Sequence, residues 1–366
     1  MDAYQKSIKT IIADSGKDYV ILKDSIFHKE GGGQPADRGR IGSQEILRYD
    51  GEKFYLKNNP FKKGEEATLS IDWDYRYDLM KAHTAEHLLF CSMKKIKPEL
   101  EIEKISLSCN ESSIFIKGTM TTEELIKSQR LANEKIREGL EITEELVKKE
   151  EVKDARIKLE KIREENARII SIGGYDKAAC SGTHVASTKE IGFLIISGAK
   201  KESLNITKVS FITGEKALDY SIKSAALLNE LTVLLNDSAE KLKQRIISVT
   251  EENAELKSGI RKLSDQVINL TALKPENGII FQDFPEIETE RLIKKASIES
   301  ETNDVIFVNS NTVIVAGKNS DKIFEALKSE LGITGGGREV KIGRIKNIDL
   351  NAVKKALNQA KVIIKN

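Results

Sequence analysis

Residues 74–95 read DYRYDLMKAHTAEHLLFCSMKK, and the arrangement of the chain follows from this stretch. Its residue pattern is that of a helix. His83 and His87 lie four residues apart on it, so both imidazoles project from one face, one turn apart. Two histidines in this geometry are a standard pair of ligands for a single metal ion.

Short apolar runs on both sides of this helix predict strands. They are YVILK (19–23), ATLSI (67–71), KISLSC (104–109), SIFIKG (113–118), ARIISI (167–172), IGFLIIS (191–197) and ITKVSFIT (206–213). A second helix is expected to begin at Thr121, which forms a capping-box pattern with Glu124, and to continue through a charged stretch to about Lys161. Strands and helices mixed in this way indicate an α+β fold.

A heptad repeat follows in residues 215–272, which contain no proline. Leucine and valine occupy one set of positions seven apart, and β-branched residues and one asparagine occupy the set between them. The first set is Leu242, Val249, Leu256, Leu263 and Leu270; the second is Ile246, Asn253, Ile260 and Val267. This pattern favours a parallel two-stranded coiled coil in which Asn253 sets the register. An intramolecular helical hairpin is the alternative.

After Pro275 the runs NGIIFQ, DVIFV and TVIVAG predict strands that alternate with helices near 287–298, 319–331 and 350–364. The chain is therefore expected to have four parts. They are a β-rich N-terminal domain at 1–73, an α+β domain at 74–219, a helical coiled-coil segment at 220–274 and a small α/β domain at 275–366.

Composition excludes several classes of protein. No run of eighteen apolar residues is present, so a membrane span is not expected. The first residues, MDAYQKSIKTIIAD, lack the apolar core of a signal peptide. Three cysteines in 366 residues do not make a disulfide framework, which favours a reducing, cytoplasmic location.

Cys180 and His184 form a second four-residue pair, in ACSGTHV, where Gly182 indicates a turn. With His83 and His87 they make a set of nitrogen and sulfur donors that suits Zn²⁺. The two pairs lie far apart in sequence, so they must meet through the tertiary fold. A small zinc finger, which closes its site within a short loop, is therefore disfavoured.

Other interpretations of these residues stay open at this point. Each histidine and the cysteine, taken alone, would fit a packed core. HTAEH also matches the inverted zinc-peptidase motif, with Glu86 as the base. A structural zinc in a non-catalytic RNA-binding or dimerisation protein would use the same four donors.

Two glycine clusters are the remaining candidates for a binding site. Gly31, Gly32 and Gly33 let the main chain approach a ligand closely, and Gln34 adds an amide; a flexible hairpin is the alternative. The second cluster, TGGGREVKIGRIKN (334–347), could form a phosphate nest or a tight turn. Residues 338–366 hold eight basic and two acidic side chains, in a chain of net charge +2. Charge alone favours a solvated helix face there over a phosphate contact.

FHKEGGGQPADRG (27–39), HTAEHLL (83–89) and CSGTHVASTKEIG (180–192), in this order, resemble the alanyl-tRNA editing family. This family includes the free-standing AlaX proteins and the editing half of alanyl-tRNA synthetase. WDYRYDLM before the histidines and VSFITGEKALDY after residue 208 also resemble it. The helical segment and the GGGRE-containing tail resemble the C-terminal module of the synthetase, which the long form of AlaX also has. No part of the chain resembles the aminoacylation domain.

The resemblance implies a zinc-dependent deacylase that hydrolyses mischarged tRNA(Ala), chiefly the seryl ester and also the glycyl ester. It implies zinc ligands at His83, His87, Cys180 and His184, and an aminoacyl pocket lined by the glycine motif (Gly31, Gly32, Gly33, Gln34). Ser25 lies where the family often has a threonine that recognises serine. The tail residues expected to bind tRNA are Arg338, Lys341, Arg344 and Lys346. A homodimer through helices at 238–270 is also expected.

The chain departs from the family pattern at a few positions. His28 and Lys29 replace a usual Tyr-Pro, Ser181 replaces a usual glycine, and Glu86 stands where a threonine is common. None of these changes removes a ligand, so they bear on the shape of the pocket and the rate rather than on the class of reaction.

Overall fold

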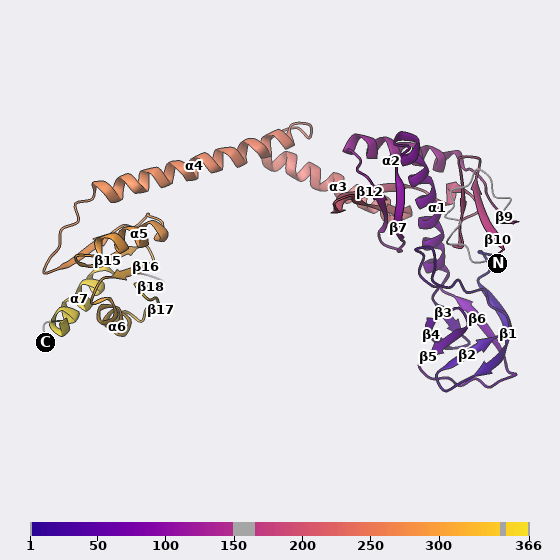
Figure 1. The fold of residues 1–366 in the computed structure, drawn as a ribbon, viewed down its shortest axis with the longest axis horizontal. Helices are drawn as coiled ribbons and strands as arrows, with labels where there is room; N and C mark the ends of the chain where they lie inside the picture. Colours follow the sequence, from indigo (N-terminus) through magenta and orange to yellow (C-terminus); the bar gives the residue numbers. More distant parts are fainter. Residues whose placement is uncertain (1, 149–164, 345–348, 365–366) are drawn as a thin grey trace. The chain divides into compact units, whose positions relative to one another are not determined.

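The computed structural model describes residues 2–148, 165–344 and 349–364, with side chains up to Leu357. They form two compact units that divide between Leu231 and Thr232, each mixing helices and strands (Figure 1). The expected α+β class is confirmed. Among the described helices, none combines the length and the hydropathy that a membrane span needs.

The chain begins with a six-stranded closed barrel, in the order β1-β2-β5-β4-β3-β6. Its strands are β1 (Ser7–Ser15), β2 (Tyr19–Leu22), β3 (Gly39–Ile41), β4 (Gln44–Tyr49), β5 (Lys53–Leu56) and β6 (Glu66–Ile71). Alternate residues point inward, and Ile12, Val20 and Leu69 are fully buried in the barrel core. Antiparallel pairing of β1 with β6 closes the barrel and removes the open sheet edge.

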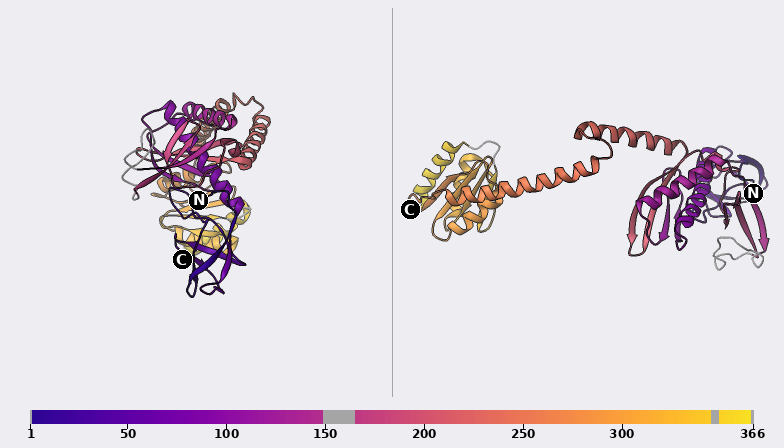
Figure 2. Two further views of the ribbon diagram at one scale, coloured as in Figure 1. Left: turned by 90° about the vertical axis from the view of Figure 1, so that its right-hand side faces the viewer. Right: turned by 90° about the horizontal axis from the view of Figure 1, so that it is seen from above.

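The helix α1 (Trp73–Ile96) leaves the barrel directly after β6, and the side chain of Asp72 caps it by accepting from the Tyr75 N–H (3.2 Å). One side of α1 contacts the four-stranded sheet β12-β13-β8-β7, and the other contacts the strand β11 (Asp176–Ala179) of a second sheet (Figures 1 and 2). The four strands are β7 (Glu101–Ser106), β8 (Ser112–Lys117), β12 (Leu194–Ser203) and β13 (Ile206–Thr213). Almost every residue from Leu79 to Met93 is buried, so α1 is the core of this unit.

The second helix, α2 (Thr122–Glu138), begins as predicted, because Thr121 and Glu124 form the capping box. The predicted continuation to Lys161 is wrong. Gly139 adopts a left-handed conformation (φ 71°) that ends the helix, and the next residues form β9 (Ile142–Lys148). Charged side chains taken for a helix surface pair across this sheet instead, such as Glu145 of β9 with Lys177, two strands away (2.9 Å). The rest of that prediction, residues 149–164, lies outside the described residues.

β9 is the edge of a three-stranded sheet in the order β11-β10-β9. Its neighbours are β10 (Asn166–Ile172) and β11 (Asp176–Ala179), and all pairs are antiparallel. A short helix, η3 (Thr188–Ile191), follows the loop after β11. This sheet therefore places the ACSGTHV loop beside α1.

Two long helices follow, α3 (Gly214–Leu235) and α4 (Leu242–Leu270), separated by a turn in which Asn236 has a positive φ of 49°. The helix α4 spans the whole predicted heptad. Several of its heptad leucines are exposed in the single chain: Leu256 (67%), Leu263 (62%) and Leu270 (84%). The coiled coil itself stays a prediction.

The last part of the chain is a five-stranded sheet in the order β14-β15-β16-β18-β17, in which β14 and β15 are parallel. The strands are β14 (Ile279–Asp283), β15 (Asp304–Asn309), β16 (Thr312–Ala316), β17 (Thr334–Gly336) and β18 (Val340–Arg344). Its helices are α5 (Thr289–Glu299), α6 (Ser320–Leu331) and α7 (Leu350–Ile364). One core lies under α6 and α7 and the other under α5, so both faces of β15 and β16 are buried. The described part of the second glycine cluster, residues 334–344, was expected to be a nest or a turn and forms the β17–β18 hairpin.

A buried ion pair joins the barrel to α1. Arg76 and Asp37 are both fully buried, and the Arg76 Nε donates to Asp37 Oδ1 (2.8 Å), while the two groups also meet through the guanidinium Nη2. Arg76 also donates to the carbonyl of Ile26 (2.7 Å). Breaking such a pair by removing one partner typically costs about 3–5 kcal/mol. This pair therefore ties the loop after β2 to the first turn of α1.

Candidate metal centre

The structure brings the two predicted donor pairs together. His83 and His87 project from α1, and Cys180 and His184 come from the loop after β11. Their ligand atoms all lie within 4.8 Å of one another. The Cys180 Sγ is 3.2 Å from His83 Nε2 and 3.3 Å from His184 Nε2. These are contacts among four donors that converge on one point.

Each histidine ring of this cluster is held by a hydrogen bond at its other nitrogen. The Nδ1 atoms of His83, His87 and His184 lie 2.8 Å from Gln34 Oε1, 3.0 Å from Asp176 Oδ2 and 3.2 Å from Thr84 Oγ1, respectively. Such partners fix the orientation of the ring and leave Nε2 facing the metal position. The cluster is therefore pre-oriented for coordination.

Sequence reasoning missed two of these three partners, Asp176 and Thr84. Thr84 lies between the two histidines and Asp176 lies four residues before Cys180, but neither type of residue is rare in this chain. Gln34 was predicted to line an aminoacyl pocket, and its amide also contacts a candidate ligand, His83. Only the packing of the β11 loop against α1 reveals these roles.

The electrostatics of the cluster favour metal-binding forms of two donors. Burial opposes an ionised Cys180, but His83 and His184 outweigh it and hold the pKa of the Cys180 thiol well below its usual value. Burial lowers the pKa of His184 to about 3, so this imidazole is neutral at pH 7. Thiolate and neutral imidazole are the forms that bind metal ions.

His87 behaves differently in the metal-free protein. Burial lowers its pKa, but the hydrogen bonds to Asp176 and Cys180 outweigh burial and raise the pKa to about 10. A carboxylate behind a metal-binding histidine is a common arrangement, because it also makes the ligand nitrogen more basic. A metal ion must displace one proton from His87 at neutral pH.

The donor set fits a metal ion. Three imidazole nitrogens and one thiolate are the chemistry of a four-coordinate Zn²⁺ site. The three histidines are nearly fully buried, and Cys180 is half-buried.

The glycine motif forms a tight turn beside this cluster. Gly31 and Gln34 exchange backbone hydrogen bonds (3.0 and 2.9 Å) around Gly32 and Gly33, whose φ angles are 61° and 88°. Both central residues of such a turn need positive φ, which explains the two glycines. Gly33 also accepts from the Leu107 N–H (2.8 Å), which ties the turn to the segment after β7.

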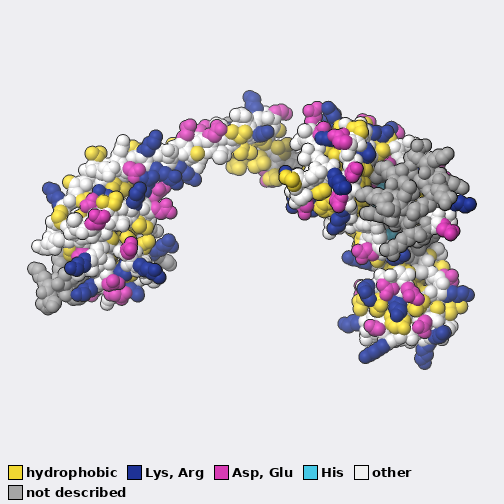
Figure 3. Space-filling model, viewed as in Figure 1, with side chains coloured by type: hydrophobic (Ala, Val, Ile, Leu, Met, Phe, Trp, Pro, Cys, Tyr) yellow, Lys and Arg dark blue, Asp and Glu magenta, His cyan; other side chains and the backbone are white. Residues whose placement is uncertain are grey.

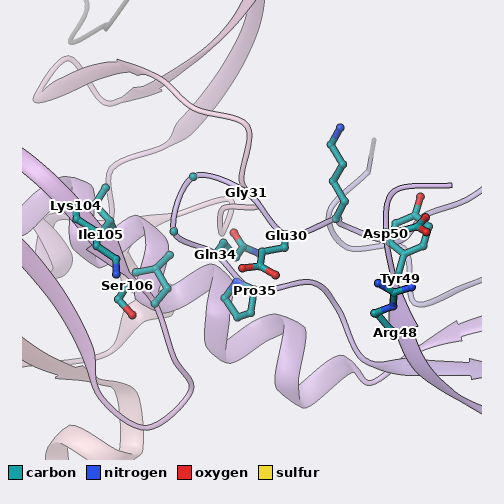
Figure 4. A pocket seen from close by; sticks show the side chains of 14 residues that line it. Glu30, Gly31, Gln34, Pro35, Arg48, Tyr49, Asp50, Lys104, Ile105 and Ser106 are labelled. Carbon is teal, nitrogen blue, oxygen red and sulfur yellow. The ribbon is translucent and has the colours of Figure 1, made fainter. Parts of the chain in front are cut away.

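The turn forms one wall of a pocket of about 830 Å³. Figure 4 shows the turn between Arg48–Asp50 of the barrel and Lys104–Ser106 of β7. Three cationic side chains, Lys29, Arg48 and Lys104, line the pocket together with Glu30, Asp50 and Tyr49. The predicted residues Gly31, Gly32, Gly33 and Gln34 all line it as well.

Gln34 joins the pocket to the metal cluster. Its Oε1 contacts His83 Nδ1 and accepts from the Thr183 N–H (3.0 Å), and its Nε2 donates to the Thr183 hydroxyl (2.8 Å). Its side chain is fully buried. The glycine turn is thus locked to one ligand on α1 and to the loop that carries the other two.

The remaining predicted residues lie elsewhere. Ser25 is half-buried, and its Oγ accepts from the Phe27 N–H (3.1 Å). Ser25 does not line the pocket, but it hydrogen-bonds to Tyr49, which does. Arg338 and Arg344 are exposed. Lys341 is buried and pairs with Asp321 (2.8 Å), so its ammonium group is not available to a phosphate. Lys346 lies outside the described residues.

Comparison with known proteins points to one group of proteins. Residues 167–209 match the family described as threonyl and alanyl tRNA synthetase second additional domain. The chain is 28% identical to alanyl-tRNA editing protein AlaX-L of Pyrococcus horikoshii, over 92% of this chain and 91% of that protein. It is 28% identical to alanyl-tRNA editing protein Aarsd1 of Danio rerio, over 72% of this chain and 66% of that protein.

The chain also aligns with alanine–tRNA ligases. The chain is 27% identical to the alanine–tRNA ligase of Ignicoccus hospitalis, over 92% of this chain. It spans 40% of the length of that ligase, and less than two thirds of the length of the Danio rerio protein.

The close packing of Gly182 against the cluster yields a test of the centre. A Cβ at Gly182 would lie 2.1 Å from His83 Cε1 and 2.7 Å from Gln34 Oε1. Because His83 is pinned, Gly182→Ala must displace the ring, and we expect Zn²⁺ affinity to fall by about 10- to 100-fold, the usual cost of disturbing a ligand's support. Competition with a chelating dye measures this affinity.

Gly198→Ala is the matched control, because no atom lies within 4 Å of a Cβ at Gly198. It should bind Zn²⁺ like the wild type. Wild-type affinity in Gly182→Ala would show that His83 does not hold the ion.

Proposed function

We propose that the chain is an alanyl-tRNA editing protein of the AlaX type, a Zn²⁺-dependent deacylase of mischarged tRNA(Ala). The substrate would be the ester between tRNA(Ala) and a wrong amino acid, chiefly serine and also glycine. The observation that carries the proposal is the direct link, through Gln34, between a pocket for a ligand and a cluster of four metal donors. We place the reaction in the cytoplasm.

The chain's own residues have distinct roles in this proposal. His83, His87, Cys180 and His184 hold the ion, which when bound polarises an ester carbonyl or activates water. Asp176, Thr84 and Gln34 keep the three rings in place. The glycine turn and the cationic side chains of the pocket, such as Lys29 and Lys104, receive the 3′ end of the tRNA.

Selectivity for serine needs a partner for its hydroxyl. Sites built to hydrogen-bond a hydroxyl reject the analogue that lacks it by about 10⁴-fold or more. We assign this role to Ser25, which reaches the pocket wall through its hydrogen bond to Tyr49. The alanyl ester, which has no such hydroxyl, would then be spared, and the glycyl ester, which also lacks it, would be hydrolysed much more slowly than the seryl ester.

Release of serine from Ser-tRNA(Ala) tests the proposal directly. We expect release by the Zn²⁺-loaded protein, and a loss of about 100-fold or more in metal-stripped protein and in Cys180→Ala. The reason is that a catalytic ion supplies several kcal/mol of transition-state stabilisation. Ala-tRNA(Ala) should stay intact.

The controls of this assay separate the alternatives. Ser25→Ala should reduce the ratio of the hydrolysis rates of the seryl and alanyl esters, while the Zn²⁺ content stays unchanged. An unchanged rate ratio would count against a role of Ser25 in selectivity. If serine remains attached although Zn²⁺ is fully bound, the protein is better described as a tRNA-binding protein with a structural ion.

We further propose that the C-terminal part, 275–366, is a DHH-associated-like domain that binds tRNA. The exposed residues Arg338 and Arg344, near the β17–β18 hairpin, are its phosphate contacts in the described part of the chain. Lys341 is left out because of its pair with Asp321. Binding through phosphates depends strongly on salt, because counterions are released.

Arg338→Ala/Arg344→Ala should weaken tRNA binding at 0.1 M salt and reduce the slope of log affinity against log salt by about 1 to 2. Filter binding over a salt series measures both. Lys294→Ala/Lys322→Ala removes two exposed charges from the same part of the chain and is the matched control. Equal slopes in the two double variants would remove the arginines from the interface.

A homodimer through the heptad of α4 is the last part of the proposal. Exposed apolar side chains lie along α4, and Figure 3 shows others over α3. Leu256 and Leu263 are 67% and 62% exposed in the single chain, which is unusual for leucines in a regular seven-residue pattern. A second copy of α4 would cover them and would pair Asn253 with its counterpart.

Leu256→Asp/Leu263→Asp should convert the dimer to a monomer, because two buried charges would replace apolar contacts along the seam. Sedimentation equilibrium gives the mass directly. Ser258→Asp adds a charge to the same exposed helix between the two leucines, off the heptad seam, and should leave the dimer intact. A monomeric wild-type chain would contradict the dimer.

A further inference from the structure

Arg168 of β10 contacts the start of the loop that carries Cys180 and His184. Its Nη1 donates to the carbonyl oxygens of Cys180 (3.0 Å) and Gly182 (2.7 Å). Its own carbonyl oxygen accepts from the Cys180 N–H (3.0 Å). Arg168 therefore holds one candidate ligand through both its main chain and its side chain.

The bend centred on Ser181 needs such a restraint. Ser181 is exposed, and Gly182 must lack a side chain because His83 lies where a Cβ would be. Glycine leaves the main chain more conformational freedom than other residues do. Among the described residues, no other side chain donates to the carbonyl of Cys180 or of Gly182. The direction in which the Cys180 Sγ points therefore depends on Arg168.

Glu144 of β9 holds the other side of the same guanidinium. The Arg168 Nε donates to Glu144 Oε2 (3.0 Å), and Nη2 donates to the same oxygen. The Glu144 side chain is 49% exposed, and ion pairs with such exposure contribute little to stability. A planar guanidinium can, however, bind a carboxylate along one edge and carbonyl groups through its remaining donors. The pair with Glu144 therefore orients Nη1 toward the loop.

We propose that Arg168 is a positioning residue of the metal centre: it directs the Cys180 Sγ toward the three histidine nitrogens and so raises the affinity of the site for a divalent ion. This inference rests on the metal-binding part of the proposed function and does not depend on the reaction. Groups that orient metal ligands typically change the metal affinity by about 10- to 100-fold.

The Zn²⁺ affinity of the full-length protein, measured against a chelating dye, tests this role without any tRNA. Arg168→Met removes the donors to both carbonyls, and we expect it to bind Zn²⁺ about 10- to 100-fold more weakly than the wild type. Arg168→Lys keeps the charge, but its single ammonium group cannot serve the two carbonyls and Glu144 together. It should bind Zn²⁺ more weakly than the wild type and more tightly than Arg168→Met.

The absorption spectrum of the Co²⁺-loaded protein reports on the Cys180 ligand itself. A cysteine thiolate bound to Co²⁺ gives a charge-transfer band in the near ultraviolet, whose intensity depends on how the sulfur meets the metal. We expect Arg168→Met at saturating Co²⁺ to show a weaker band than the wild type. A residue that only stabilised the sheet would lower the melting temperature in chelator and leave this band unchanged.

Lys177→Met is the matched control. Lys177 of β11 pairs with Glu145 of β9 (2.9 Å) in the same three-stranded sheet, and its side chain is 41% exposed. The change also removes a cation and an ion pair from this sheet, but it leaves the contacts of Arg168 in place. It should bind Zn²⁺ like the wild type and give the same Co²⁺ band.

Three results would overturn the role of Arg168. They are a Zn²⁺ affinity within twofold of the wild type in Arg168→Met or Arg168→Lys, an unchanged Co²⁺ band in Arg168→Met, or an equal loss of affinity in Lys177→Met. If Arg168→Met does not fold, Arg168→Lys decides by both measurements. A wild type that binds no Zn²⁺ would remove the metal centre and this role with it. A Zn²⁺-loaded protein that releases no serine would contradict the deacylase proposal alone.

Discussion

The fold of the first unit depends on satisfying the polar side chains that α1 buries. This helix is enclosed from Leu79 to Met93, yet it carries an arginine, two histidines, a threonine and a glutamate inside the protein. Buried polar groups without partners are too costly to persist, so other segments must supply partners. Asp37 meets Arg76, Gln34 meets His83, and Asp176 meets His87. These contacts position the barrel loop, the glycine turn and the β11 loop around one helix.

The same contacts make one functional unit of a pocket and a cluster of metal donors. Gln34 belongs to the turn that lines the pocket, and it holds His83 and the backbone of Thr183. A ligand that moved the turn would therefore act on the orientation of a metal ligand. Gly182 packs so closely against His83 and Gln34 that there is no room for a side chain at this position. Glu86 is buried beside this site, and its Oε1 has no hydrogen-bond partner among the described residues.

Sequence patterns predicted the elements well where local rules decide them. The capping box at Thr121 and the periodicity of α1 and α4 located three helices, because caps and helical spacing depend on neighbours in the chain. The stretch after Gly139 was predicted as helix and forms β9, since its partner strand β10 lies beyond reach of a local pattern. Lys341 looked like a free cation in the sequence, but the fold buries it against Asp321.

The candidate site residues can be identified from the sequence alone, from two four-residue spacings of histidine and cysteine and from a glycine motif followed by glutamine. These are properties of residue type and of short-range geometry, which a sequence displays. The residues that surround them depend on how the folded chain packs. Asp176 and Thr84 support the histidine rings, and Gln34 connects the glycine turn to His83, because folding brings together segments that are far apart in the sequence. Glu86 is buried because other segments pack around α1.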